Sequence, residues 1–185
     1  HSKKNSLCYE GFSIRHGPVF QEGLDTNTRR SIYSLLNPTT RYNLFKLMRA
    51  MVLDRAILLE GLPGVGKTSL VLELAKITGH RVTRINLSDQ TDISDFFGAD
   101  LPLPEGNEEE KTSAFLKFGW SDGTFVSALK RGDWVILDEL NLAPQPVLEG
   151  LNSCLDHRRN IFIPEINLHL ACPDTFRVFA TQNPV

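Results

Sequence analysis

Apolar positions along the chain follow two alternating spacings, one typical of buried strands and one typical of amphipathic helices. Short apolar runs of strand length lie at residues 56–60, 81–87, 134–139 and 176–180. Stripes with helical spacing lie at residues 39–51, where Pro38 can start the helix, and at residues 69–79 and 144–156. Strands that alternate with helices in this way indicate an α/β fold.

The other segments are less regular. Residues 1–37 contain several glycines and no clean period, and we expect an irregular N-terminal lead-in that packs across the back of the domain. A short helix is predicted over residues 88–97, followed by a solvated acidic loop over residues 100–112. Two hairpins are predicted, one over residues 115–126 that leads into a helix, and one over residues 159–172.

A glycine-rich segment follows the first predicted strand and precedes a predicted helix. Its sequence, Gly61-Leu62-Pro63-Gly64-Val65-Gly66-Lys67-Thr68, fits the phosphate-loop pattern at every fixed position. Glycines let successive backbone N–H groups surround phosphates, and the N-terminus of the following helix adds partial positive charge. Lys67 is expected to reach the β- and γ-phosphates and the Thr68 hydroxyl to bind Mg²⁺. The predicted nucleotide-binding residues are Gly61, Pro63, Gly64, Val65, Gly66, Lys67, Thr68 and Ser69.

Polar side chains lie at the carboxyl ends of two later predicted strands. Asp138 and Glu139 follow an apolar run, and ligands of open α/β sheets bind at the carboxyl ends of strands. Asp138 is therefore placed to hold Mg²⁺ through water, and Glu139 to orient and polarise an attacking water molecule. Asn183 follows the last strand and would lie beside the γ-phosphate if the strands are neighbours. From local sequence alone, Asn183 fits an Asn-Pro turn equally well.

Composition limits the remaining choices. The net charge is −2, from 20 basic and 22 acidic residues, so we expect no direct sequence-specific contact with nucleic acid. The longest apolar stretch, residues 50–62, is interrupted by charged residues and does not predict a membrane span or a membrane partner. The 3 cysteines and 5 histidines show no metal-motif spacing. The phosphate loop and the acidic strand end therefore predict a nucleotide and Mg²⁺ as cofactors, and the resemblance described next implies that the nucleotide is ATP.

A phosphate loop, an acidic strand end and a strand that ends in asparagine occur in the order seen in the AAA+ ATPases. Within them the sequence resembles the clade of magnesium chelatases, MoxR, McrB, dynein and the midasins, and most closely the midasin family. The segments that carry the resemblance are residues 57–70, 79–80, 84–92, 97–102, 132–143, 147–152, 155–158 and 179–184.

The resemblance implies a P-loop NTPase core of the AAA+ type, with a parallel sheet flanked by helices. The segment before Trp134 resembles the helix-2 insert of the clade, and residues 159–172 resemble its pre-sensor-1 hairpin. Asn183 matches the sensor-1 residue, which places it with Glu139 as a catalytic residue. The family's fifth strand, arginine-finger segment and lid would follow Val185, so residues 38–185 are expected to be a partial AAA+ domain, truncated before the lid.

The midasin family further implies one module of a six-module ring that uses ATP hydrolysis in the nucleus (nucleolus and nucleoplasm). Such a ring releases assembly factors from precursors of the large ribosomal subunit. The implied partners are neighbouring AAA+ modules of the same chain, pre-ribosomal particles and those factors. Two alternatives stay open: a structural nucleotide-binding module without turnover, and a MoxR- or McrB-type NTPase, because ATP over GTP rests on the resemblance. Glu139 favours turnover, since a structural site needs no carboxylate that polarises water.

Overall fold

A four-stranded parallel sheet forms the centre of the protein. The computed structural model describes residues 6–9, 11–20, 37–102, 118–155, 159–163 and 166–184. Adjacent strands of the sheet pair in parallel. Their order is β3 (Ile57–Glu60), β10 (Arg177–Gln182), β7 (Trp134–Asp138) and β4 (Val82–Asn86). The α/β prediction and all four predicted strands are confirmed.

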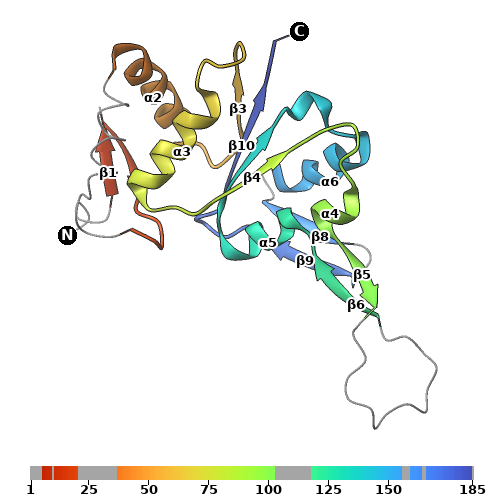
Figure 1. Cartoon of the computed structure of the whole chain (residues 1–185). Coiled ribbons are helices and arrows are strands. Elements are labelled where there is room, and N and C mark those ends of the chain that lie inside the picture. Colours follow the sequence, from red (N-terminus) through yellow and green to blue (C-terminus); the bar gives the residue numbers. More distant parts are fainter. Residues whose placement is uncertain are drawn as a thin grey trace, which may run out of the picture.

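Both faces of the sheet are covered, and for this reason β7 is buried at every position. Alternate side chains of a strand point to opposite faces. Trp134 and Ile136 join one apolar cluster, whereas Val135 and Leu137 join the other. Figure 1 shows the sheet between these two layers.

Two helices cover the first face. They are α2 (Pro38–Ala50) and α3 (Lys67–Thr78), and the predicted start of α2 at Pro38 is confirmed. The apolar stripe of α2 is buried through Leu44, Leu47 and Met48. Gly79 is the C-cap of α3 and adopts a left-handed conformation with φ of 72°, and a Cβ there would clash with the backbone of Phe20. Glycine is therefore required at this position.

Three helices and a hairpin cover the second face (Figure 1). The helices are α4 (Ile93–Phe97), α5 (Thr124–Arg131) and α6 (Gln145–Leu155). The hairpin pairs β8 (Asn160–Ile163) with β9 (Leu168–Ala171), which confirms the hairpin predicted over residues 159–172. Among the described residues, no helix has the length and apolar character needed to cross a membrane.

The hairpin predicted over residues 115–126 is wrong. Strand β6 (Phe118–Asp122) instead pairs antiparallel with the upstream strand β5 (Gly98–Pro102). Gly123 is the N-cap of α5, so this turn leads into a helix and does not reverse a strand. The acidic loop is likewise shorter than predicted, because β5 extends to Pro102; residues 103–112 lie outside the described residues.

Two other elements differ from prediction. The helix predicted over residues 88–97 begins only at Ile93, because the Asp92 side chain caps it by accepting a hydrogen bond from the Ser94 amide at 2.8 Å. Part of the lead-in is regular: β1 (Ser6–Tyr9) and β2 (Phe12–Arg15) pair antiparallel. This pair packs on α2, where the Phe12 and Phe45 rings lie 5.5 Å apart. The described residues 6–9 and 11–20 contact the domain, and the rest of the lead-in lies outside the described residues.

A histidine at the end of α3 makes stability depend on pH. The His80 ring stacks on Trp134 at 4.4 Å, and burial, His16 and Arg177 lower its pKa from 6.5 to about 4. Between these values the unfolded chain binds a proton that the folded chain does not, so stability should fall as pH decreases from 6.5 towards about 4. Urea unfolding across this range measures the loss.

His80→Phe retains an aromatic ring against Trp134 and should remove this part of the pH dependence. His169→Phe is the matched control, because the exposed His169 ring stacks on Phe162 at the same 4.4 Å and should leave the dependence in place. A parent and a His80→Phe variant with the same pH profile would contradict the prediction.

Candidate functional site

The predicted phosphate loop connects β3 to α3. Gly64 and Gly66 have φ values of 77° and 87°, a left-handed region that glycine enters without penalty. A Cβ at either position would meet no atom within 4 Å, so backbone conformation and not space requires glycine. Gly66 is the N-cap of α3, and the first amides of the helix are free of intrahelical partners. Anions bind readily at such a helix end.

Lys67 lies across this loop and contacts the end of β10. Its ammonium donates to the Gly61 carbonyl at 2.6 Å, to the Leu62 carbonyl at 3.1 Å and to Asn183 Oδ1 at 3.0 Å. These acceptors use all three donors of the ammonium group. Phosphate oxygens would compete with these three acceptors for the Lys67 ammonium.

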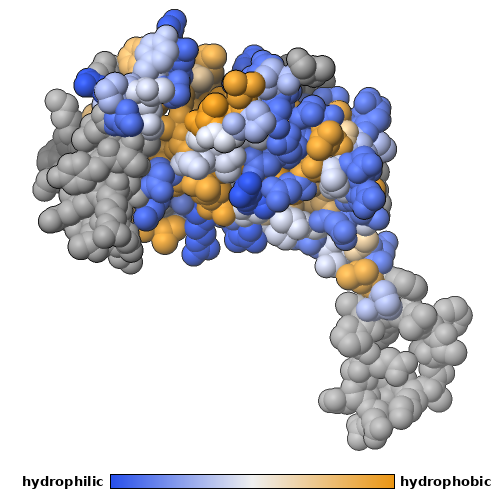
Figure 2. All heavy atoms as spheres, turned by 45° about the horizontal axis from the view of Figure 1, so that its top comes forward, coloured by the Kyte–Doolittle hydropathy of each residue, from blue (hydrophilic) through white to orange (hydrophobic). Residues whose placement is uncertain are grey.

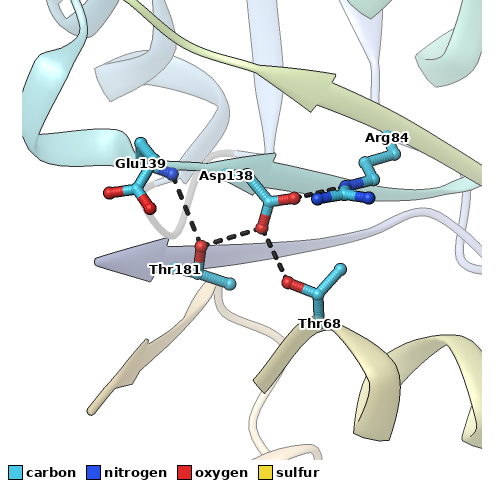
Figure 3. A network of polar contacts seen from close by, with 5 residues as sticks. All are labelled: Thr68, Arg84, Asp138, Glu139 and Thr181. Carbon is cyan, nitrogen blue, oxygen red and sulfur yellow. Dashed lines mark hydrogen bonds and ion pairs between the residues drawn. The ribbon is translucent and has the colours of Figure 1, made fainter. Parts of the chain in front are cut away.

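Asp138 is the centre of a second group of contacts, shown in Figure 3. Its Oδ1 accepts hydrogen bonds from the Thr68 and Thr181 hydroxyls, each at 2.8 Å. Its Oδ2 accepts from Nε of Arg84. Burial raises the pKa of the carboxyl, but hydrogen bonds from Arg84, Thr181 and Thr68 lower it more, and the pKa lies below its ordinary value. Asp138 is therefore ionised at neutral pH.

Asn183 joins the two groups. Its Nδ2 donates to both carboxylate oxygens of Glu139, at 2.9 and 3.1 Å, while its Oδ1 accepts from Lys67. Glu139 itself has a left-handed φ of 57°, which is uncommon outside glycine. The sequence predicts Asn183 beside the γ-phosphate on the condition that the strands are neighbours. Strand β10 lies between β3 and β7, so this condition is met.

The other predicted nucleotide-binding residues lie around the loop. Val65 and Ser69 line a groove of about 520 Å³ between α2, β3 and α3. Pro63 is exposed and makes none of the polar contacts described above. Figure 2, which turns the top of Figure 1 forward, shows exposed hydrophobic atoms interspersed with hydrophilic ones. Exposed hydrophobic residues of the loop and β3 are Leu58, Leu62 and Val65.

Two residues of this site were missed in the sequence, Arg84 and Thr181. The alternation of side chains along β4 could have indicated part of the role of Arg84. Arg84 and Asn86 share a face of the strand, and Asn86 is the register partner of Asp138. The sequence of neither strand, however, predicts by itself that β4 pairs with β7. Thr181 is 3% exposed, and its hydroxyl also accepts a hydrogen bond from the Glu139 amide at 3.4 Å.

Thr181→Val should destabilise the domain by about 1–3 kcal/mol, because it leaves a buried carboxylate oxygen with one donor fewer at nearly unchanged side-chain volume. Thr181→Ser keeps the hydroxyl and should recover most of this loss. The free energy of unfolding in urea is the measurement. Equal stability of the valine and parent proteins would show that the hydroxyl contributes nothing to the folded state.

The donor set of the site fits Mg²⁺. The Thr68 hydroxyl and the Asp138 carboxylate place oxygen atoms 2.8 Å apart, and Mg²⁺ prefers few protein oxygens together with water and substrate phosphates. No group of three or more His, Cys, Asp or Glu side chains able to hold a metal ion occurs among the described residues.

A phosphate loop between strand and helix, with an acidic strand end and an asparagine beside it, defines a P-loop nucleotide-binding domain. The sequence matches the AAA domain, dynein-related subfamily, over residues 56–185. The chain belongs to this family, and the AAA fold predicted from the sequence is confirmed.

The resemblance to midasin is also confirmed. Midasin of Dictyostelium discoideum is 52% identical over 168 residues, which cover 91% of this chain and 3% of that protein. Midasin of Giardia intestinalis is 52% identical over 172 residues, which cover 93% of this chain and 3% of that protein. The chain thus spans a small part of these relatives.

A solved structure supports the fold. A candidate ATPase from Cytophaga hutchinsonii superimposes with a TM-score of 0.56 at 25% identity, over 86% of this chain and 45% of that protein. An uncharacterized protein of Staphylococcus aureus is 30% identical over 131 residues, which cover 71% of this chain and 48% of that protein.

Proposed function

We propose that this chain binds ATP with Mg²⁺ and hydrolyses it as a AAA+ module. One observation carries the proposal: hydrogen bonds connect Lys67, Asn183 and Glu139 at the same end of the sheet where Thr68 binds Asp138. These are the side-chain types needed to hold phosphate, metal and attacking water. They come from the start of helix α3 and from the ends of two neighbouring strands, β7 and β10.

Each residue has a distinct part in this mechanism. Loop amides and Lys67 bind the β- and γ-phosphates, and Thr68 with Asp138 would hold Mg²⁺. When bound, the ion neutralises charge that develops on the phosphates. Glu139 takes a proton from the attacking water or polarises it, and Asn183 fixes the position of the Glu139 carboxylate.

The proposed role extends to a larger assembly. Similarity to midasin supports a place among neighbouring AAA+ modules of one chain, arranged in a ring. There, ATP hydrolysis would release assembly factors from pre-ribosomal large-subunit particles in the nucleus, in its nucleolus and nucleoplasm. This part of the proposal rests on family resemblance and goes beyond the contacts of the site.

Calorimetric titration of the chain with ATP, ADP and GTP, each with and without Mg²⁺, tests the nucleotide assignment. We expect ATP and ADP to bind, with ATP binding strengthened by Mg²⁺. Phosphate release measured in parallel distinguishes a hydrolysing module from a structural one, because a structural module binds without release at every protein concentration. Tighter binding of GTP than of ATP would favour the McrB-type alternative.

A further inference from the structure

Arg84 is a cation at the proposed magnesium site that the mechanism above does not use. It lies on β4, the edge strand next to β7, and its register partner is Ile136. Asp138 follows Ile136 by two positions on β7, so it faces the same side of the sheet. Figure 3 shows the Arg84 guanidinium beside the Asp138 carboxylate, opposite Thr68.

The two carboxylate oxygens of Asp138 have different partners. Oδ1 accepts from the hydroxyls of Thr68 and Thr181, and Oδ2 accepts from Arg84. Two hydroxyl donors on one oxygen and the charged Nε–H of Arg84 on the other restrict the rotation of the carboxylate. Arg84 therefore helps to direct Oδ1 at the Thr68 hydroxyl.

The charges of this pair are unequally buried. The Asp138 side chain is 8% exposed and the Arg84 side chain is 53% exposed. The guanidinium can therefore turn towards solvent without leaving a buried charge of its own. While it stays, it cancels the negative charge that would attract a divalent cation to Asp138.

We propose that Arg84 is a positioning residue that sets the Mg²⁺ requirement of nucleotide binding, which rests on the function proposed above. By offsetting the charge of Asp138, it keeps the affinity of the empty loop for free Mg²⁺ low. The negative charge of the nucleotide phosphates then becomes necessary for the ion to bind. Metal and nucleotide consequently enter the site together.

The test compares two variants that make the same change in two similar ion pairs. Arg84→Met removes the cation next to Asp138. Arg131→Met removes the cation next to Asp133, which is 4% exposed and pairs with Arg131 at 2.9 Å. Asp133 lies at the opposite end of β7, about 16 Å away, which is beyond the Debye length of about 8 Å.

The measured quantity is the Mg²⁺ concentration that gives half of the maximal increase in ATP affinity. It should fall about tenfold in Arg84→Met, because a nearby like charge no longer opposes the ion. It should stay at the parent value in Arg131→Met and within about threefold of it in Arg84→Lys, which keeps the charge. The effect of Arg84→Met should shrink as salt is added.

An unchanged or higher half-saturating Mg²⁺ concentration in Arg84→Met would overturn the role of Arg84. If the parent chain itself shows no Mg²⁺-dependent ATP binding, the proposed function fails, and this inference fails with it. Thermal unfolding of each variant is measured alongside. If Arg84→Met does not fold, Arg84→Gln replaces it, with Arg131→Gln as its control.

Discussion

Lys67→Ala is expected to weaken ATP binding by about 30-fold or more, with little change in the stability of the domain. Removing one partner of a phosphate–ammonium contact typically reduces affinity by about 2–5 kcal/mol, since the other charge is left without its partner. In the structure the ammonium contacts two loop carbonyls and Asn183, and none of these joins the apolar core. Calorimetry gives the affinity, and thermal unfolding gives the stability.

Lys76→Ala is the matched control for this prediction. Lys76 lies in the last turn of the same helix and is exposed, so its removal changes net charge equally at a distance of about 13 Å. We expect its ATP affinity to remain within about threefold of the parent. Equal affinities of Lys67→Ala and the parent would exclude residues 61–68 as the phosphate site.

Glu139→Gln is expected to retain ATP binding and to reduce hydrolysis by about 10²- to 10⁴-fold, the range that general-base catalysis contributes. The amide has nearly the shape of the carboxylate, and its oxygen can still accept from Asn183. It cannot, however, take up a proton at neutral pH. Phosphate release and ATP affinity are measured on the same preparation, at protein concentrations that allow neighbouring modules to associate.

Glu149→Gln provides the control, because Glu149 is a carboxylate on α6 that accepts from Gln145 at 3.1 Å, in an exposed contact away from the site. Its rate and affinity should equal those of the parent. If Glu139→Gln hydrolyses ATP at the parent rate, another group activates the water. If the parent binds ATP and releases no phosphate under any condition, the structural alternative is favoured.

Local sequence was sufficient to predict those elements whose pattern lies entirely within their own residues. The four sheet strands, the helix from Pro38 and the phosphate loop with its left-handed glycines all follow from apolar spacing and turn chemistry. Strand β6 was assigned to the wrong hairpin for the opposite reason. Its partner β5 lies on the far side of residues 103–117, and the glycine turn next to it gave a stronger local signal than the distant pairing.

The site shows the same division. The phosphate-loop motif predicted Lys67 and Thr68, and the acidic end of an apolar strand predicted Asp138. The structure places the Thr68 hydroxyl against the Asp138 carboxylate. The proximity of Arg84 and Thr181 to Asp138 follows only from the strand order and register, which depend on long-range packing and could not be predicted from local sequence. Similarly, the lead-in was predicted as irregular because four-residue strands such as β1 and β2 are too short to show a period.

The strand order has a consequence for the order in which the domain is made. Lys67 and Asn183 are 116 positions apart, and β10 is the only partner of β3 among the described strands. A ribosome that adds about 5–20 residues per second reaches β10 roughly 6–23 s after the phosphate loop. Before β10 is made, β3 has no partner strand among the described strands, so the phosphate loop is not anchored to a sheet. A nucleotide stabilises only a state of the chain that can bind it, and that state does not yet exist. If the chain binds ATP as proposed, ATP would therefore stabilise the domain only after β10 has been made, and it would not guide the folding of the earlier residues.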